Sequence, residues 1–148
     1  SGAALRRIID RPGDAPIALL RLDEGEAARL AGRMLDRPGE TADLAAGLVA
    51  RGVARTVIVA RGADGSVLAD KTGRLHCVAP QVKVVSKVGA GDSFIGGYVL
   101  KLAQGGSQSE ALRAGVAAAA SAVATEATRL CVREEVLRLM PLCTLSEI

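Results

Sequence analysis

A glycine-rich turn that ends in an aspartate is the part of this sequence whose residues could carry chemistry. An apolar segment, residues 82–86, leads into Gly89, Gly91 and Asp92, and a helical pattern continues to about residue 103. The first N–H groups of a helix lack partners within it, so they can bind a phosphate oxygen, which glycine lets approach closely. Asp92 would then lie beside the phosphate, where a carboxylate can act as general base in phosphoryl transfer.

The same residues also have a purely structural explanation. An aspartate in a first helical turn is a common cap, and glycines are frequent in turns, so both interpretations stay open. A dinucleotide-binding loop is not favoured, because Gly96 follows Gly91 too late for G-x-G-x-x-G and no second strand follows the helix. The glycine-lysine-serine/threonine sequence of a P-loop is absent.

Three other features are candidate sites. Asp23 and Glu26 lie three residues apart where a strand pattern meets a helical one, so they could share one helix face and hold a metal ion through water. Acidic groups at a helix start more often only complement the helix dipole. Residues 62–65 follow a strong strand pattern and favour a hairpin turn over a ligand loop. His76, the single histidine, belongs to no motif and is interpreted as a strand residue.

Composition excludes several classes of function. The 148 residues are 49% hydrophobic and 24% charged, as in an ordinary globular domain, but only 1% aromatic, which argues against a stacking platform for nucleic acid. The three cysteines are widely spaced and indicate neither a disulfide framework nor a zinc site, which favours a reducing compartment. No apolar run is long enough to span a membrane. We therefore expect a cytoplasmic protein that binds neither nucleic acid nor membrane.

The elements that must position the turn follow from hydrophobic periodicity. Helices are expected over residues 3–10, 24–35, 41–51, 92–103, 107–124 and 133–140, and strands over residues 17–22, 56–60, 67–70, 75–78 and 82–86. A turn is expected at residues 11–14, a helix end at Gly52, and a capping box between Ser107 and Glu110. Alternating strands and helices predict an α/β fold with a mainly parallel sheet. We expect one domain, residues 1–148, without an internal boundary.

The order of these motifs resembles the C-terminal half of the ribokinase/PfkB family of carbohydrate kinases. Residues 88–94, V-G-A-G-D-S-F, resemble the family's hallmark T-V-G-A-G-D-S-F. Supporting similarities lie at residues 61–65 (the nucleotide-side turn), 23–26 (N-x-x-E in the family), 1–5, and 128–131 with 100–103. The last pair is most similar to the minor 6-phosphofructokinase branch. The resemblance covers essentially the whole chain and implies a three-layer α/β/α, Rossmann-like (ribokinase-like) fold with a partial sheet, because the N-terminal half is absent.

The resemblance also implies a reaction and a site. The intact protein, expected to be a homodimer, would use ATP and Mg²⁺ to phosphorylate a sugar phosphate of the fructose 6-phosphate, fructose 1-phosphate or tagatose 6-phosphate type. Asp92 would be the base, the backbone of Gly89, Ala90 and Gly91 the anion hole, and Glu26 would hold Mg²⁺ through water. The positions that match the nucleotide site are Arg21, Asp23, Gly62, Val84, Val116 and Ala120. Those that match a monovalent-cation (K⁺) site are Ser86, Val88, Ala122, Thr125, Ala127 and Arg129.

Some positions depart from the family pattern. Lys87 replaces a small or hydroxyl residue just before the turn, where its cation could replace the monovalent ion or reach the phosphate. Asp23 replaces an asparagine and adds negative charge near the metal. Two alternative functions therefore stay open: a nucleotide-binding remnant without catalysis, and a kinase of an unphosphorylated sugar or nucleoside.

Overall fold

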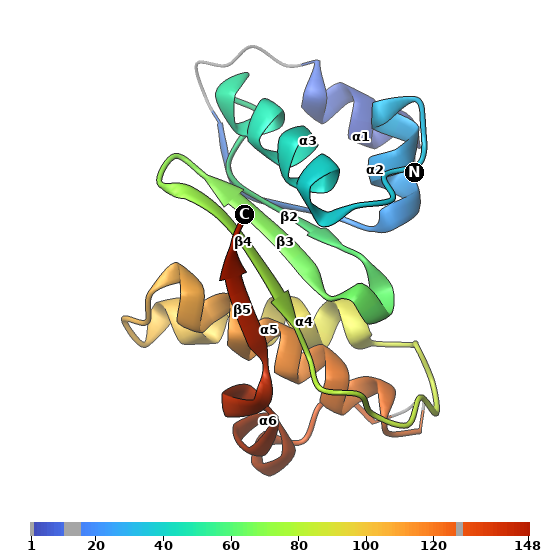
Figure 1. Cartoon of the computed structure of the whole chain (residues 1–148), viewed down its shortest axis with the longest axis vertical. Coiled ribbons are helices and arrows are strands. Elements are labelled where there is room, and N and C mark those ends of the chain that lie inside the picture. Colours follow the sequence, from blue (N-terminus) through green and yellow to red (C-terminus); the bar gives the residue numbers. More distant parts are fainter. Residues whose placement is uncertain (1, 11–15, 127–128) are drawn as a thin grey trace. The chain divides into compact units, whose positions relative to one another are not determined.

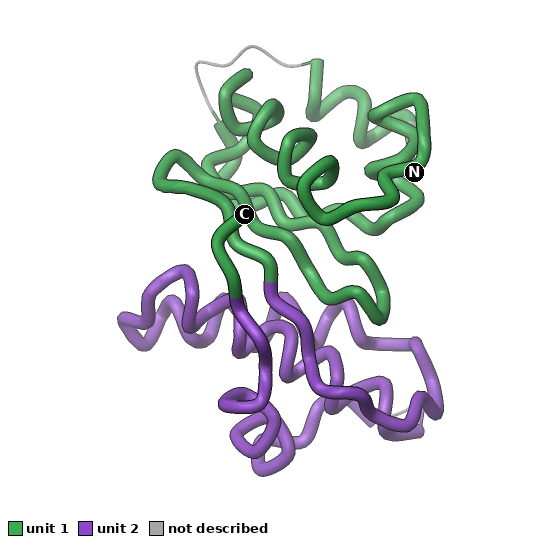
Figure 2. Tube along the Cα trace, in the orientation of Figure 1, with its two compact units in different colours: residues 1–76, 146–148 green, residues 77–145 purple. Residues whose placement is uncertain are grey.

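The computed structural model describes residues 2–10, 16–126 and 129–148 (Figure 1). The turn expected at residues 11–14 lies outside the described residues. Contacts divide the chain into two compact units, residues 1–76 with 146–148, and residues 77–145 (Figure 2). The expectation of a single domain without an internal boundary stays a prediction.

The first unit holds most of a mixed five-stranded sheet in the order β1-β2-β3-β4-β5. Its strands are β1 (Ile17–Leu22), β2 (Ala54–Ala60), β3 (Ser66–Asp70), β4 (Gly73–Val78) and β5 (Thr144–Glu147). β1 and β2 run parallel with Ile17 opposite Ala54, whereas β2 and β3 run antiparallel with Thr56 opposite Asp70. The prediction of a mainly parallel sheet is therefore wrong, because the short turn at residues 61–65 can join only antiparallel strands.

The helices of the first unit are α1 (Gly2–Ile9), α2 (Glu24–Ala31) and α3 (Pro38–Ala50), and a 3₁₀ turn spans Gly62–Asp64. Their apolar faces and the strands β1 and β2 form one core. Leu22 and Val57 from the strands and Ala45 and Leu48 from α3 are all buried in it. Because side chains alternate along a strand, Ile58, which is also fully buried, lies on the opposite face of β2.

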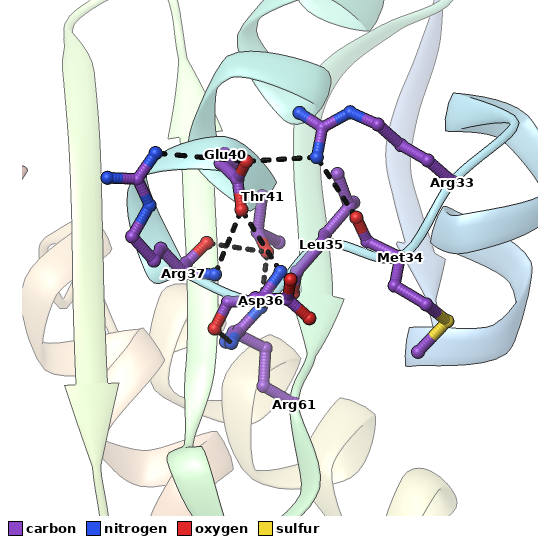
Figure 3. A network of polar contacts seen from close by, with 8 residues as sticks. All are labelled: Arg33, Met34, Leu35, Asp36, Arg37, Glu40, Thr41 and Arg61. Atoms are coloured by element: carbon purple, nitrogen blue, oxygen red, sulfur yellow. Dashed lines mark hydrogen bonds and ion pairs between the residues drawn. The ribbon is translucent and has the colours of Figure 1, made fainter.

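A buried arginine at the end of β2 organises the connection between α2 and α3 (Figure 3). The Arg61 guanidinium donates hydrogen bonds to the carbonyl oxygens of Leu35 (2.9 Å) and Asp36 (3.0 Å) and to Oγ1 of Thr41 (2.5 Å). Its side chain is only 3% exposed, and among the described residues its ion-pair partner is the carboxylate of Asp64, 3.9 Å away. Neutral oxygens therefore provide most of the compensation for burying this charge.

Glu40 holds the other side of this connection. Its carboxylate accepts the backbone N–H groups of Asp36 (3.0 Å) and Arg37 (3.1 Å) and a hydrogen bond from the Arg33 guanidinium (2.9 Å). The backbone hydrogen bond from Arg37 and then the Arg33 guanidinium keep the pKa of Glu40 below its ordinary value. These contacts start α3 at Pro38, earlier than the predicted residue 41. α2 in turn ends at Ala31 instead of residue 35, because Gly32 adopts the left-handed conformation (φ 68°).

The second unit is built on two helices, α4 (Ala90–Ala103) and α5 (Gln108–Val123). They pack so closely that there is no room for a side chain between their backbones at Gly97. A Cβ placed on Gly97 of α4 would lie 2.9 Å from both the carbonyl oxygen of Ala114 and Cβ of Ala118 on α5. Small residues thus let the helices touch, and most residues of the alanine-rich α5 are buried. The predicted capping box is also confirmed: Ser107 Oγ accepts from the N–H of Glu110 (3.2 Å).

The remaining elements of this unit are α6 (Arg133–Leu139) and a 3₁₀ turn, Met140–Leu142. Cys77 and Cys143 are buried, Cys131 is partly buried, and all three are free thiols. β5 was not predicted, because the sequence T-L-S-E is short and mostly exposed and carries no strand pattern. No helix among the described residues is long and apolar enough to cross a membrane.

The strand predicted at residues 82–86 does not form. The backbone N–H groups of Val85 (2.7 Å) and Ser86 (3.1 Å) both donate to the carbonyl oxygen of Val123, at the C-terminal end of α5. The last carbonyl groups of a helix lack partners within it, so they compete for the N–H groups that a strand would need. The segment therefore enters the glycine turn as an extended loop attached to α5.

Two adjacent glycines of α4 test the close packing of the helices. Replacing Gly97 with alanine forces its methyl group against Ala114 and Ala118, and we expect it to lower the free energy of unfolding by about 1–3 kcal/mol. Gly96 is exposed and a Cβ there meets nothing within 4 Å, so Gly96→Ala should raise stability by about 0.5–1 kcal/mol through helix propensity. Denaturant unfolding of both variants measures the difference, and equal effects would contradict the packing.

The hydrogen bonds of Arg61 lead to a second prediction about stability. In Arg61→Lys the single ammonium cannot reach the acceptors that the guanidinium fork bonds, and we expect a loss of about 1–3 kcal/mol in the free energy of unfolding. Arg55→Lys, on the exposed side of the same strand, is the matched control and should change stability by less than about 0.5 kcal/mol. Thermal and denaturant unfolding provide the measurement. An Arg61→Lys chain as stable as the control would show that the network contributes little.

Candidate functional site

The glycine turn of the second unit leaves the start of α4 open. Gly89 is the N-cap residue in the left-handed conformation (φ 78°), and as a glycine it has no side chain with which to cap the helix. By contrast, Asp23 caps α2 and Ser107 caps α5. The N–H groups of Gly91 and Asp92 lie in the first turn of α4, where the helix itself offers them no partner. This end of α4 can therefore donate hydrogen bonds to an anion, and the dipole of a 14-residue helix favours negative charge there.

Asp92 occupies the third position of α4, and its side chain is exposed. The alternative explanation of this residue as a helix cap is wrong, because the N-cap position belongs to Gly89 and no side-chain cap bond is formed. The carboxylate is thus placed at the same helix end as the open N–H groups of the turn. In this place it can accept a proton from a hydroxyl group that approaches an anion bound there.

Oxygen atoms gather just beyond the end of α5. Oγ1 of Thr125 lies 2.9 Å from the carbonyl oxygens of both Ala122 and Arg129, and its single proton can serve only one of them at a time. Neutral oxygens in such a cluster suit a hard cation. Of the six positions predicted for a monovalent cation, the structure thus brings these three together. Ala127 lies outside the described residues.

The two other positions predicted for this cation lie on the loop that enters the turn. Ser86 Oγ accepts from the N–H of Val88 at 3.2 Å, and the N–H of Ser86 itself is bonded to Val123 beside the oxygen cluster. An open pocket adjoins the cluster, and its lining residues are Val85, Ala124, Thr125, Glu126 and Arg129. Hydroxyl and carbonyl oxygens in this part of the chain are thus ligands of the type that a hard cation binds.

The positions predicted for the nucleotide site within the second unit differ in accessibility. Val84 is 57% exposed on the loop, so its side chain can contact a ligand. Val116 (5%) and Ala120 (6%) lie one turn apart on the same face of α5 and are almost buried. They can present only a small apolar surface. Their role in nucleotide binding stays a prediction.

In the first unit, Asp23 and Glu26 form a capping box at the start of α2. Oδ1 of Asp23 accepts from the N–H of Glu26 (2.7 Å), and Oε2 of Glu26 accepts from the N–H of Asp23 (3.0 Å). These two hydrogen bonds give both carboxylates a structural role at the start of α2. Each has a second oxygen outside the box, which suits contact with Mg²⁺ through water, and among the described residues no group of three acidic, histidine or cysteine side chains could bind a metal directly. Arg21 lies half-buried on β1, directly before this helix start.

Gly62 begins the 3₁₀ turn that joins β2 to β3 and adopts the left-handed conformation (φ 59°). The interpretation of this segment as a hairpin turn is confirmed, and its role beside a nucleotide stays a prediction. The turn is held by His76 of β4, whose Nε2 lies 2.6 Å from the carbonyl oxygen of Asp64. His76 is therefore a strand residue, as expected, with a structural contact to the turn.

Sequence reasoning missed one contact of the glycine turn. Oγ of Ser93, directly after Asp92, lies 3.4 Å from the N–H of Cys131, which donates to it. The two residues are far apart in the chain, and no spacing pattern could have connected them.

The chain is similar in sequence to known proteins. The model of the pfkB family of carbohydrate kinases matches residues 15–135, which is more than half of the chain. The ATP-dependent 6-phosphofructokinase isozyme 2 of Escherichia coli is 35% identical over 139 residues, covering 88% of this chain and 45% of that protein. The 1-phosphofructokinase of Haloferax volcanii is 34% identical over 124 residues, covering 84% and 40%.

A solved structure shows the same fold. The crystal structure of phosphofructokinase-2 from Escherichia coli in complex with substrates and products matches with a TM-score of 0.85 and 34% identity, over 96% of this chain and 45% of that one. The expected ribokinase-like α/β fold with a partial sheet is thereby confirmed. The chain spans less than half the length of the curated relatives it matches. By its motif, its fold and these similarities, the chain belongs to the PfkB family of carbohydrate kinases.

Proposed function

We propose that this chain supplies the ATP site and the catalytic base for transfer of a phosphoryl group from ATP to a hydroxyl group of a sugar phosphate. The observation that carries the proposal is the uncapped start of α4, with Gly89 left-handed and the Asp92 carboxylate at the same helix end. An anion site beside a carboxylate is what phosphoryl transfer requires of a protein. The names of two relatives, a 6-phosphofructokinase and a 1-phosphofructokinase, support a phosphorylated fructose as acceptor.

The chemistry assigned to the turn follows from its donors. The N–H groups of Gly89, Ala90 and Gly91 would stabilise the charge that develops on the γ-phosphoryl group. Asp92 would take the proton of the sugar hydroxyl while the new P–O bond forms and the bond to the β-phosphate breaks. Mg²⁺, placed through water by Glu26 with Asp23, would neutralise charge on the leaving phosphates. A homodimer of the intact protein stays a prediction.

A second candidate is a kinase of an unphosphorylated nucleoside. An aminoimidazole riboside kinase of Salmonella typhimurium is 42% identical over 59 residues, although these are only 40% of the chain. The two candidates share the ATP site and the base, and they differ only in the acceptor.

Release of ADP with MgATP and a panel of sugars, sugar phosphates and nucleosides tests the proposal. We expect turnover with a fructose phosphate by the protein at its full natural length, and a loss of about 10²–10⁴-fold in kcat for Asp92→Asn, because the base is removed. Glu134→Gln, at an exposed position in the first turn of α6, is the matched control and should leave kcat unchanged. Binding of ATP without turnover of any acceptor would instead favour a catalytically inactive nucleotide-binding protein.

Potassium dependence tests the oxygen cluster. We expect kcat/KM for ATP to rise several-fold when K⁺ replaces Na⁺ at constant ionic strength. Thr125→Val keeps the shape of the side chain but removes the hydroxyl oxygen, so it should weaken this response. Thr144→Val, exposed on β5, is the control. A wild-type protein indifferent to K⁺ whose Lys87→Ala variant becomes K⁺-dependent would show that the lysine takes the place of the ion.

A further inference from the structure

The segment Arg129–Val132 packs directly against the glycine turn. A methyl group placed on Gly89 would lie 3.0 Å from Cδ2 of Leu130, so the leucine side chain fills the space beside the Cα atom of Gly89. Leu130 is nevertheless 58% exposed. Its contact with the turn therefore buries little of its own surface and adds little to the stability of the core.

Two buried serines fix this segment to the helices. The N–H of Cys131 donates to Oγ of Ser93 on α4 (3.4 Å), and the N–H of Val132 donates to Oγ of Ser121 on α5 (3.0 Å). Both serines are at most 4% exposed. Since the segment forms neither helix nor strand, its N–H groups depend on these hydroxyls.

The other end of the segment is attached to the oxygen cluster. The N–H of Arg129 donates to the carbonyl oxygen of Glu126 (2.8 Å), and the carbonyl oxygen of Arg129 lies 2.9 Å from Oγ1 of Thr125. Leu130 is thus held in place from both sides, by the cluster before it and by the serines after it.

A turn with two glycines needs such a neighbour. Glycine has more backbone freedom than any other residue, so Gly89 and Gly91 by themselves would not keep their N–H groups in one arrangement. A donor contributes fully to anion binding only when it already points to the place of the charge, since ordering it afterwards costs free energy. Leu130 restricts the turn at Gly89, and the bond of Ser93 with Cys131 restricts it after Asp92.

We propose that Leu130 and Ser93 are positioning residues, which hold the N–H groups of the glycine turn in the arrangement that binds the terminal phosphate of the nucleotide. The inference rests on the proposed function, because it takes the turn as the site of that phosphate. It adds to that function a role for Leu130, an exposed residue that is distant from the glycine turn in the sequence. The two residues act through the backbone of the turn and need not touch the substrate.

The preference for ATP over ADP, measured by calorimetry on the protein at its full natural length, tests the inference. Leu130→Ala should reduce this preference about tenfold, the effect of misdirecting a hydrogen bond to a charged group, with little change in ADP affinity. Leu130→Met keeps an apolar side chain that can reach Gly89 and should largely retain the preference. Leu137→Ala on α6 is the matched control, because Leu137 is 59% exposed, and it should change neither affinity.

A general loss of stability would lower the affinities for both nucleotides and the melting temperature together, so a selective loss for ATP separates positioning from stability. Ser93→Ala should shift the preference in the same direction. If wild type prefers ATP but Leu130→Ala and Ser93→Ala keep that preference, the positioning role is wrong while the proposed function stands. If wild type binds ATP and ADP equally, or binds neither, phosphate binding at the turn fails, and both proposals fall with it.

Discussion

The contact of α4 with α5 at backbone distance is the constraint on which the second unit depends. It exists because Gly97 offers no side chain where Ala114 and Ala118 approach. The end of α5 then holds the loop that enters the glycine turn, through the carbonyl oxygen of Val123. The start of α4 and the end of α5 thereby become parts of one arrangement. A carbonyl oxygen at the end of α5 bonds the loop, and N–H groups at the start of α4 have no partner within the helix, as an anion site would require.

In the first unit, the connection between α2 and α3 is built around a buried charge. Arg61 is fully enclosed, yet its hydrogen bonds go to carbonyl and hydroxyl oxygens rather than to a close carboxylate. Such an arrangement favours a guanidinium, whose fork of donors can serve several acceptors at once. It fixes the segment before α3 to the strand end from which the Gly62 turn begins. Packing and the geometry of that turn are therefore coupled within this unit.

The carboxylates of Asp23 and Glu26 show how one pair of residues can serve two purposes. Each gives one oxygen to the capping box and keeps another outside it. An asparagine in place of Asp23 would cap the helix equally well, so the charge of the aspartate is not needed for the fold. The second oxygen of each carboxylate therefore remains available for the water-mediated contact with Mg²⁺ that is proposed above.

The sequence by itself determined the features that depend on neighbours in the chain. The bounds of β1, the hairpin turn at residues 62–65, the capping box of α5 and the glycine turn all follow from short-range hydrogen bonding and periodicity, and the sequence predicts each of them. Only the tertiary structure decided that residues 82–86 attach to α5 instead of forming a strand, that Arg61 bonds Leu35, and that Leu130 lies against Gly89. These outcomes depend on which group, distant in the sequence, provides a hydrogen-bond partner for an N–H or C=O group or fills a space between elements. The spacing of residues along the chain does not determine which group that is.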